Sequence, residues 1–139
     1  MSLDQICARW IVAHPSILWV PRLLMVWMFV ESAIDKYSRF AFFAEEAGAR
    51  RIPFPRTAIA AAFVVELLGA VSMLTGMASV VALSLLSGYV LVLTFIYFDF
   101  WDFRGETAIA DRKEFFKNIA VAGGLFALTL ATLILGSRG

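Results

Sequence analysis

The segment Ala78–Phe98 reads ASVVALSLLSGYVLVLTFIYF and contains no charged residue on any helical face. A helix needs about 20 predominantly apolar residues to cross the hydrocarbon core of a bilayer. Segments 57–75 and 115–136 have a similar length and composition. A soluble four-helix protein would instead alternate polar and apolar positions around each helix. The sequence therefore predicts an all-α, polytopic membrane protein.

The composition supports this class. Hydrophobic residues make up 61% of the 139 residues, whereas a soluble domain has about 45–50%. The mean hydropathy is +0.82. The chain has the length of a single membrane domain, 1–139, and it shows no internal repeat. A net charge of +1 gives no electrostatic footprint for nucleic acid, so no nucleic-acid partner is expected.

A fourth span is predicted over residues 22–39, although Glu31, Asp35 and Lys36 crowd its second half. Packing among strongly apolar neighbours makes such a segment plausible as a span. We therefore expect an antiparallel four-transmembrane-helix bundle with spans at 22–39, 57–75, 78–98 and 115–136.

The segments between the spans differ in character. Gly76-Met77 predicts a tight turn, whereas residues 40–56 and 99–114 carry many charges and are predicted to be connecting loops. The second loop should turn at Arg104-Gly105. Residues 1–20 mix charged and apolar side chains, which is typical of an interfacial N-terminal segment.

Lys and Arg are concentrated on one side of the predicted bundle, in and beside the two charged loops. The positive-inside rule places such loops in the cytoplasm. We therefore expect loops 40–56 and 99–114 to be cytoplasmic and both termini exterior, in a cytoplasmic membrane of bacterial type.

Glu66 is the polar residue that most needs an explanation. It lies nine residues after Thr57, which is about 13 Å along a helix from the loop side. A charge this deep costs on the order of 2.5–3.5 kcal/mol on insertion scales, so it should face a protein interior or a cavity. The other charged or polar candidates belong to the same half of the bundle, and with Glu66 they form a cluster that includes Lys36, Glu31, Asp99, Trp101, Lys117 and Asn118.

Two interpretations of this cluster remain open. In the structural one, Glu66 pairs with Lys36 or Lys117 and holds the helices together. In the functional one, the cluster binds the polar head of an amphipathic ligand such as a quinone, with Glu66 exchanging protons and the lysines polarising a carbonyl. Asn118 would then donate a hydrogen bond, and Asp99 and Trp101 would shape the mouth. The residues alone favour neither.

The chain has one cysteine, Cys7, and one histidine, His14. These cannot assemble a ligand set for haem, zinc or an iron–sulfur cluster, so no metal site is expected. Any redox chemistry would need a bound organic molecule or a redox protein partner.

Several motifs resemble the DoxX family of small four-helix membrane proteins. The most specific are Phe98-Asp-Phe-Trp101 and the Lys-Asn-(x4)-Gly-Gly pattern within Phe115–Leu125. The supporting elements are Arg22, Ile-Asp-Lys36, Ile52-Pro-Phe-Pro55 and Glu66-Leu-Leu-Gly69. Family members commonly carry a histidine just before the aromatic element, where this chain has Phe98.

The resemblance implies a membrane subunit of an oxidoreductase complex. Together with the polar cluster, it leads us to expect that this subunit binds quinone or quinol. The alternative that it leaves open is a non-enzymatic scaffold or assembly factor whose basic residues Arg50, Arg51 and Arg56 dock partner proteins. The small residues Gly123, Ala127 and Ala131 recur at four-residue spacing. Such a face permits close helix packing in lipid, so a homo-oligomer through it is a further expectation.

Overall fold

The computed structural model describes residues 1–77, 79–102 and 104–136. Ala78, the predicted first residue of the third span, lies outside the described residues. The described part consists of six α-helices and one 3-10 helix, with no strand. In chain order these are α1 (Leu3–Ala13), η1 (Pro15–Leu18), α2 (Trp19–Ser38), α3 (Phe40–Ala49), α4 (Pro55–Thr75), α5 (Ser79–Tyr97) and α6 (Glu106–Gly136). The all-α class is confirmed.

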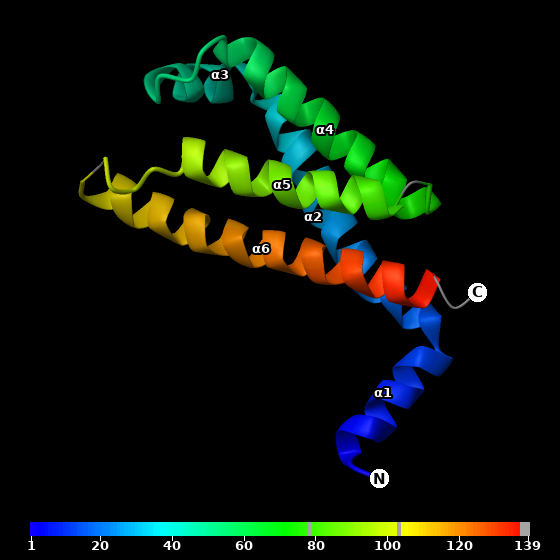
Figure 1. Cartoon of the computed structure of the whole chain (residues 1–139). Coiled ribbons are helices and arrows are strands. Elements are labelled where there is room, and N and C mark those ends of the chain that lie inside the picture. The colour runs from blue at the N-terminus through cyan, green and yellow to red at the C-terminus, as the bar shows by residue number, and fades with distance from the viewer. Residues whose placement is uncertain (78, 103, 137–139) are drawn as a thin grey trace.

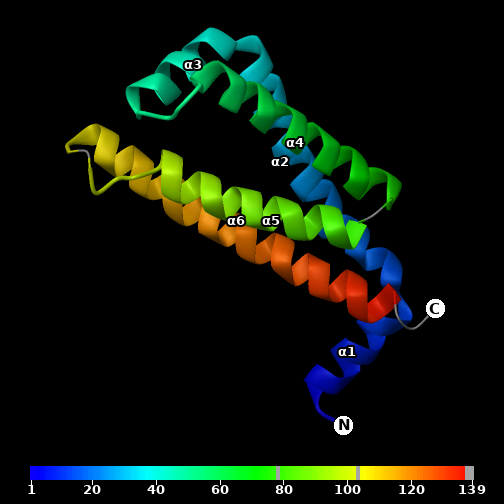
Figure 2. The same ribbon diagram turned by 45° about the horizontal axis from the view of Figure 1, so that its top comes forward.

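Four helical segments in the described chain are long and apolar enough to cross a membrane. They are Pro15–Ser38, Pro55–Thr75, Ser79–Tyr97 and Glu106–Leu135. The chain reverses at Gly76 and again between α5 and α6, which is compatible with the predicted antiparallel arrangement (Figures 1 and 2). Gly76 has φ of 74°, a left-handed conformation that glycine adopts without strain, so the turn predicted there is confirmed.

The first predicted loop, 40–56, is wrong over most of its length because Phe40–Ala49 forms α3. Alanine-rich sequence favours a helix, and Ala44 and Ala47 are buried. Apolar residues at Phe40, Phe43, Ala44 and Ala47 give this short helix a face that packs against α4. Its charges and the later prolines suggested a loop, but only residues 50–54 are irregular.

The second predicted loop, 99–114, is also shorter than expected. The helix α6 begins at Glu106, so nine residues assigned to the loop belong to its first turns. Gly105 has φ of 69° and ends the irregular segment, which confirms a turn at that point. Charged residues do not end a helix when they extend beyond the apolar span, and this is why the predicted start at residue 115 was too late.

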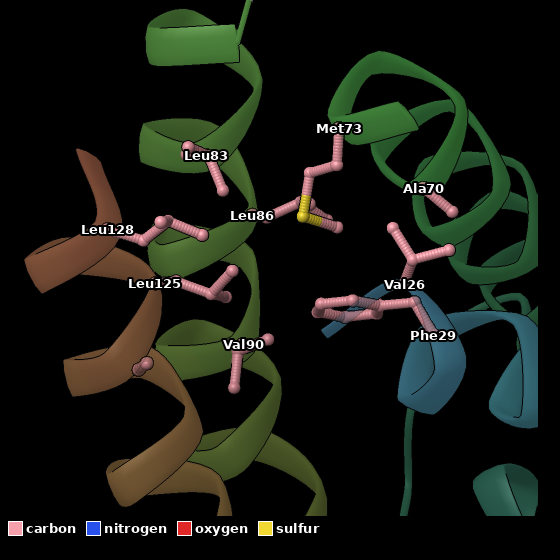
Figure 3. Packing of buried hydrophobic residues seen from close by; sticks show 10 residues of the cluster. Val26, Phe29, Ala70, Met73, Leu83, Leu86, Val90, Leu125 and Leu128 are labelled. Atoms are coloured by element: carbon pink, nitrogen blue, oxygen red, sulfur yellow. The ribbon is translucent and has the colours of Figure 1, made fainter. Parts of the chain in front are cut away.

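The largest hydrophobic cluster lies in the half of the bundle nearer the Gly76 turn. In Figure 3, Phe29 of α2 and Met73 of α4 point toward α5, whose Leu83, Leu86 and Val90 also pack against α6. Gly69 makes this approach possible: a Cβ there would lie 2.4 Å from Leu86 Cδ1. The α4 and α5 helices are therefore tightly packed near their connecting turn.

At the other end, α4 and α5 diverge in both views (Figures 1 and 2). A second, smaller buried cluster there joins α3, α4 and α5 through Ala47, Ile59 and Tyr97. The candidate site lies between these two clusters.

Two peripheral predictions concern exposed helix faces. Every residue of α1 is exposed, and the helix extends away from the others (Figure 1); its interfacial position stays a prediction. Gly123 and Ala127 are exposed on α6, so the homo-oligomer through this face also stays a prediction.

Candidate functional site

The centre of the site is an ion pair between α2 and α4. Lys36 Nζ donates to Glu66 Oε1 at 3.0 Å and to Oε2 at 3.1 Å, and it contacts Ser32 Oγ at 2.6 Å. The Tyr89 hydroxyl of α5 donates to Glu66 Oε1 at 3.2 Å. Glu66 is 3% exposed, and the Lys36 side chain is 14% exposed. Three helices thus converge on one buried carboxylate.

Helix periodicity explains why Glu66 points inward. It belongs to the buried stripe of α4 that also contains Ile59, Ala62, Gly69, Ala70 and Met73. It lies 11 residues after Pro55, about 16 Å along the helix axis. Lys36, by contrast, lies close to the end of α2. Near its start, α4 also packs against α3, where Ile59 lies in one buried cluster with Ala47.

Of the two partners expected for Glu66, the structure selects Lys36. Lys117 instead pairs with Glu114, three residues earlier on α6, and both side chains are substantially exposed. Exposed pairs of this kind contribute about 0–1 kcal/mol to stability. The Lys36–Glu66 pair is the buried one.

A cavity of about 270 Å³ adjoins this pair, between α2, α5 and α6. It brings together Glu66, Lys36, Glu31, Lys117 and Asn118, five of the seven candidate residues. Its apolar wall includes Met28, Phe29, Phe43, Leu93 and Phe98. Ser32, Asp35 and Glu114 also border it, so about half of the lining side chains are polar or charged and half are apolar or aromatic. Such a lining can bind a small molecule that has both a polar and an apolar part.

Asp99 and Trp101 do not line this cavity. Asp99 lies 3.4 Å from Arg50 Nη1 in a separate charged cluster. Trp101 contacts Phe100 and Phe115 through edge-on ring packing. The structure thus places both residues away from the lysine–glutamate pair, near the connection between α5 and α6.

The charged cluster around Arg50 was missed as a structural element. Arg50 makes two hydrogen bonds to Asp111, at 2.8 Å and 2.9 Å, and another to the Tyr97 carbonyl. Its side chain is 6% exposed, and that of Asp111 is 7% exposed. The Tyr97 hydroxyl donates to Glu46 at 2.7 Å. The cluster connects α3, α5 and α6 at the end where the helices diverge.

Burial lowers the pKa of the Arg50 guanidinium, but the hydrogen bonds with Asp111 and the nearby carboxylates raise it more, so its pKa lies above the usual value. Arg50 therefore remains charged, and its guanidinium forms hydrogen bonds with groups of the same chain. One sequence signal for this was available, since Glu46 and Arg50 are four residues apart, as expected for a helical pair. Asp111 gave no such signal because it was assigned to a loop.

Arg22 lies near the start of α2, whereas Lys36 lies near its end. Its guanidinium donates to Thr132 Oγ1 of α6 at 3.1 Å and lies over the Trp19 ring. Two hydroxyl groups of α5 donate to backbone carbonyls: Ser87 to that of Ala122 on α6, and Thr94 to that of Val90. These groups contribute to packing.

The DoxX family model matches residues 17–99. This range is more than half of the chain and contains Lys36, Glu66 and Tyr89. It ends before Phe115–Leu125, so that part of the resemblance lies outside the matched range. Neither the curated proteins nor the solved structures that were searched contain a match. With four helices able to cross a bilayer and this match, the chain is an integral membrane protein and belongs to the DoxX family.

Proposed function

We propose that this protein is the membrane subunit of an oxidoreductase complex and binds the head of a quinone or quinol in the cavity beside Lys36 and Glu66. The observation that supports this proposal is the position of the ion pair. It borders a cavity of about 270 Å³ whose lining combines polar or charged side chains with apolar ones such as Phe29 and Leu93. The cavity gives a small molecule access to the pair, and a pair that only fastened two helices would not need such access.

The residues at hand suit the chemistry of such a head group. The Lys36 ammonium can donate to a carbonyl oxygen, and the Asn118 amide offers a second donor on the α6 wall. Glu66 can accept a proton from a quinol hydroxyl, while Tyr89 holds one of its carboxylate oxygens. When bound, the quinone supplies two-electron redox chemistry. A redox protein partner would carry the electrons.

Glu31 and Lys117 extend the polar lining away from the pair. Both residues are exposed, so they connect the cavity with the surface. Protons exchanged at Glu66 would travel along this side of the cavity. By the positive-inside rule this side faces the cytoplasm.

Photolabelling tests the proposal directly. A tail-less azidoquinone is irradiated with the protein in lipid nanodiscs, and the labelled peptides are mapped by mass spectrometry. We expect saturable labelling of peptides from α2, α4 or α5 around Lys36, prevented by excess unmodified quinone. The double variant Lys36→Met/Glu66→Gln should lose this labelling, whereas Lys113→Met, an exposed lysine on α6, should retain it. Labelling that is equal in all three proteins would contradict the proposal.

The scaffold alternative keeps a specific observation in its favour: Arg51 and Arg56 are exposed beside α3 and α4. Arg50 cannot belong to that docking surface, because its side chain is buried against Asp111. To separate the two functions, the double variant Arg51→Glu/Arg56→Glu is purified and the proteins that co-purify with it are compared with those of the wild type. Loss of partners with unchanged quinone labelling would favour the scaffold function, and unchanged recovery would count against docking through this surface.

A further inference from the structure

A second cavity, of about 260 Å³, lies between α4 and α5. Its walls are Ala58, Ile59 and Ala62 from α4 and Val92, Leu93 and Ile96 from α5. Lys36 and two tyrosines are the polar side chains among its lining residues. One of these hydroxyls binds Glu66 and the other binds Glu46, so both are already engaged. The space that remains is suited to an apolar occupant.

This cavity is continuous in its lining with the cavity that contains the ion pair. Five residues border both: Lys36, Phe43, Tyr89, Leu93 and Phe98. The Lys36 ammonium therefore stands at the junction between a pocket with polar groups and a pocket that is almost entirely apolar. Each volume is close to the lower limit of about 300 Å³ for small-molecule sites, so one ligand with a polar and an apolar part would use both.

Two side chains in the lining of the apolar cavity are also exposed on the outer surface of the bundle. They are Val92 and Ile96, 60% and 54% exposed, in the second half of α5. The two helices that flank the cavity are packed closely near Gly69 and diverge toward the other end (Figures 1 and 2). Side chains exposed at this depth face the hydrocarbon of the bilayer.

We propose that the gap between α4 and α5 is a lateral port through which the isoprenoid tail of the ligand leaves the protein, while its head binds at Lys36. This inference rests on the proposed function, and it names the ligand class: a long-tailed lipid quinone taken up directly from the bilayer. The tail runs past Ala58 and Ala62 into the surrounding lipid.

The test depends on the free energy of moving the tail from the bilayer into the cavity. Lipid is as apolar as the cavity, so moving the tail between them brings no hydrophobic gain. Tail length should therefore have little effect on the affinity of the wild-type protein. An obstruction in the port acts differently, because the tail is covalently attached to the head and the other opening, beside Glu31 and Lys117, is lined by charged side chains.

The experiment measures how well two competitors prevent labelling by the tail-less azidoquinone. The competitors share one ring, and one of them carries an isoprenoid tail. In Ala58→Trp, the tailed competitor should become at least ~tenfold weaker, the effect of an overpacking cost of 1.4 kcal/mol, while the tail-less one is unchanged. The matched control is Ala61→Trp, since Ala61 is exposed on the same helix and lines neither cavity. In Ala61→Trp, both competitors should prevent labelling as well as they do in the wild-type protein.

A second measurement does not depend on the folding of a variant. A quinone with a diazirine near the start of its tail, bound to the wild-type protein, should label residues of α4 and α5 around Ala58 and Val92. Labelling confined to α2 or α6 would overturn the port, as would equal weakening of both competitors in Ala58→Trp. If the wild-type protein shows no saturable labelling by the tail-less probe, the proposed function itself fails, and the port falls with it.

Discussion

Replacing Lys36 by Met should destabilise the protein strongly, because it removes the charge that neutralises a buried carboxylate. Glu66 is 3% exposed and has Lys36 and Tyr89 as its hydrogen-bond partners. In Lys36→Met only the tyrosine remains. The new side chain has a similar length, so loss of packing contributes little and the electrostatic effect dominates.

The expected size follows from measurements on buried ion pairs. Removing one partner of such a pair costs about 3–5 kcal/mol, since the other charge is left without compensation in a medium of low polarity. The double variant Lys36→Met/Glu66→Gln leaves no buried charge, and Gln can still accept the hydrogen bond from Tyr89. It should lose only about 1–2 kcal/mol, the value of one or two ordinary hydrogen bonds. Even with no cost for Glu66→Gln alone, a double-mutant cycle would then show a coupling energy of about 1–4 kcal/mol.

The assay is unfolding by SDS in mixed micelles, followed by far-UV circular dichroism, for the wild type, both single variants and the double variant. Lys113→Met serves as the control for loss of a surface lysine and should change the free energy of unfolding by less than about 0.5 kcal/mol. A cost of less than about 1 kcal/mol for Lys36→Met would contradict a buried ion pair. A double variant as unstable as the sum of the single variants would contradict it too.

Three further predictions follow from other parts of the molecule. Gly69→Ala should destabilise the protein by about 1–3 kcal/mol in the same SDS assay, because its Cβ would lie 2.4 Å from a buried leucine of α5. Gly88→Ala, with open space around it, should be neutral or stabilising by up to about 1 kcal/mol. Equal effects of the two substitutions would contradict the close packing at Gly69. Arg50→Met should cost about 3–5 kcal/mol by leaving the Asp111 carboxylate unpaired, and it should lose most of that effect when combined with Asp111→Asn; a fully additive double variant would contradict the ion pair. Cys7 is exposed and is the chain's one cysteine, so a membrane-impermeant maleimide added to intact cells should label it if the termini are exterior; labelling that requires permeabilised cells would reverse the topology.

The spans were predictable from sequence because an uncharged run of about 20 residues has few alternatives to a membrane helix. The helix ends were less predictable. The first turns of α6 carry Glu106, Asp111 and Lys113, and such residues continue a helix as readily as they form a loop once they lie beyond the apolar core. The alanine-rich α3 was obscured in the same way by its neighbouring charges and prolines.

The candidate site was predictable in part. The depth of Glu66 indicated that it needed a partner, and Lys36 and Lys117 were both reasonable. Sequence spacing shows which residues share a helix face but not which helices lie side by side. The choice of Lys36 depends on the packing of α2 along α4, and the contact between Arg50 and Asp111 joins residues 61 positions apart. Neither can be read from a single helix.

Binding of a lipid quinone at Lys36 and Glu66 is best tested on gently purified protein, by organic extraction and mass spectrometry of the small molecules that it retains. We predict a quinone with an isoprenoid tail at about one molecule per chain. The Lys36→Met/Glu66→Gln protein, purified in the same way, should lose it while keeping its bulk phospholipid. Recovery of phospholipid alone from the wild-type protein, or equal quinone in both proteins, would contradict binding at Lys36 and Glu66.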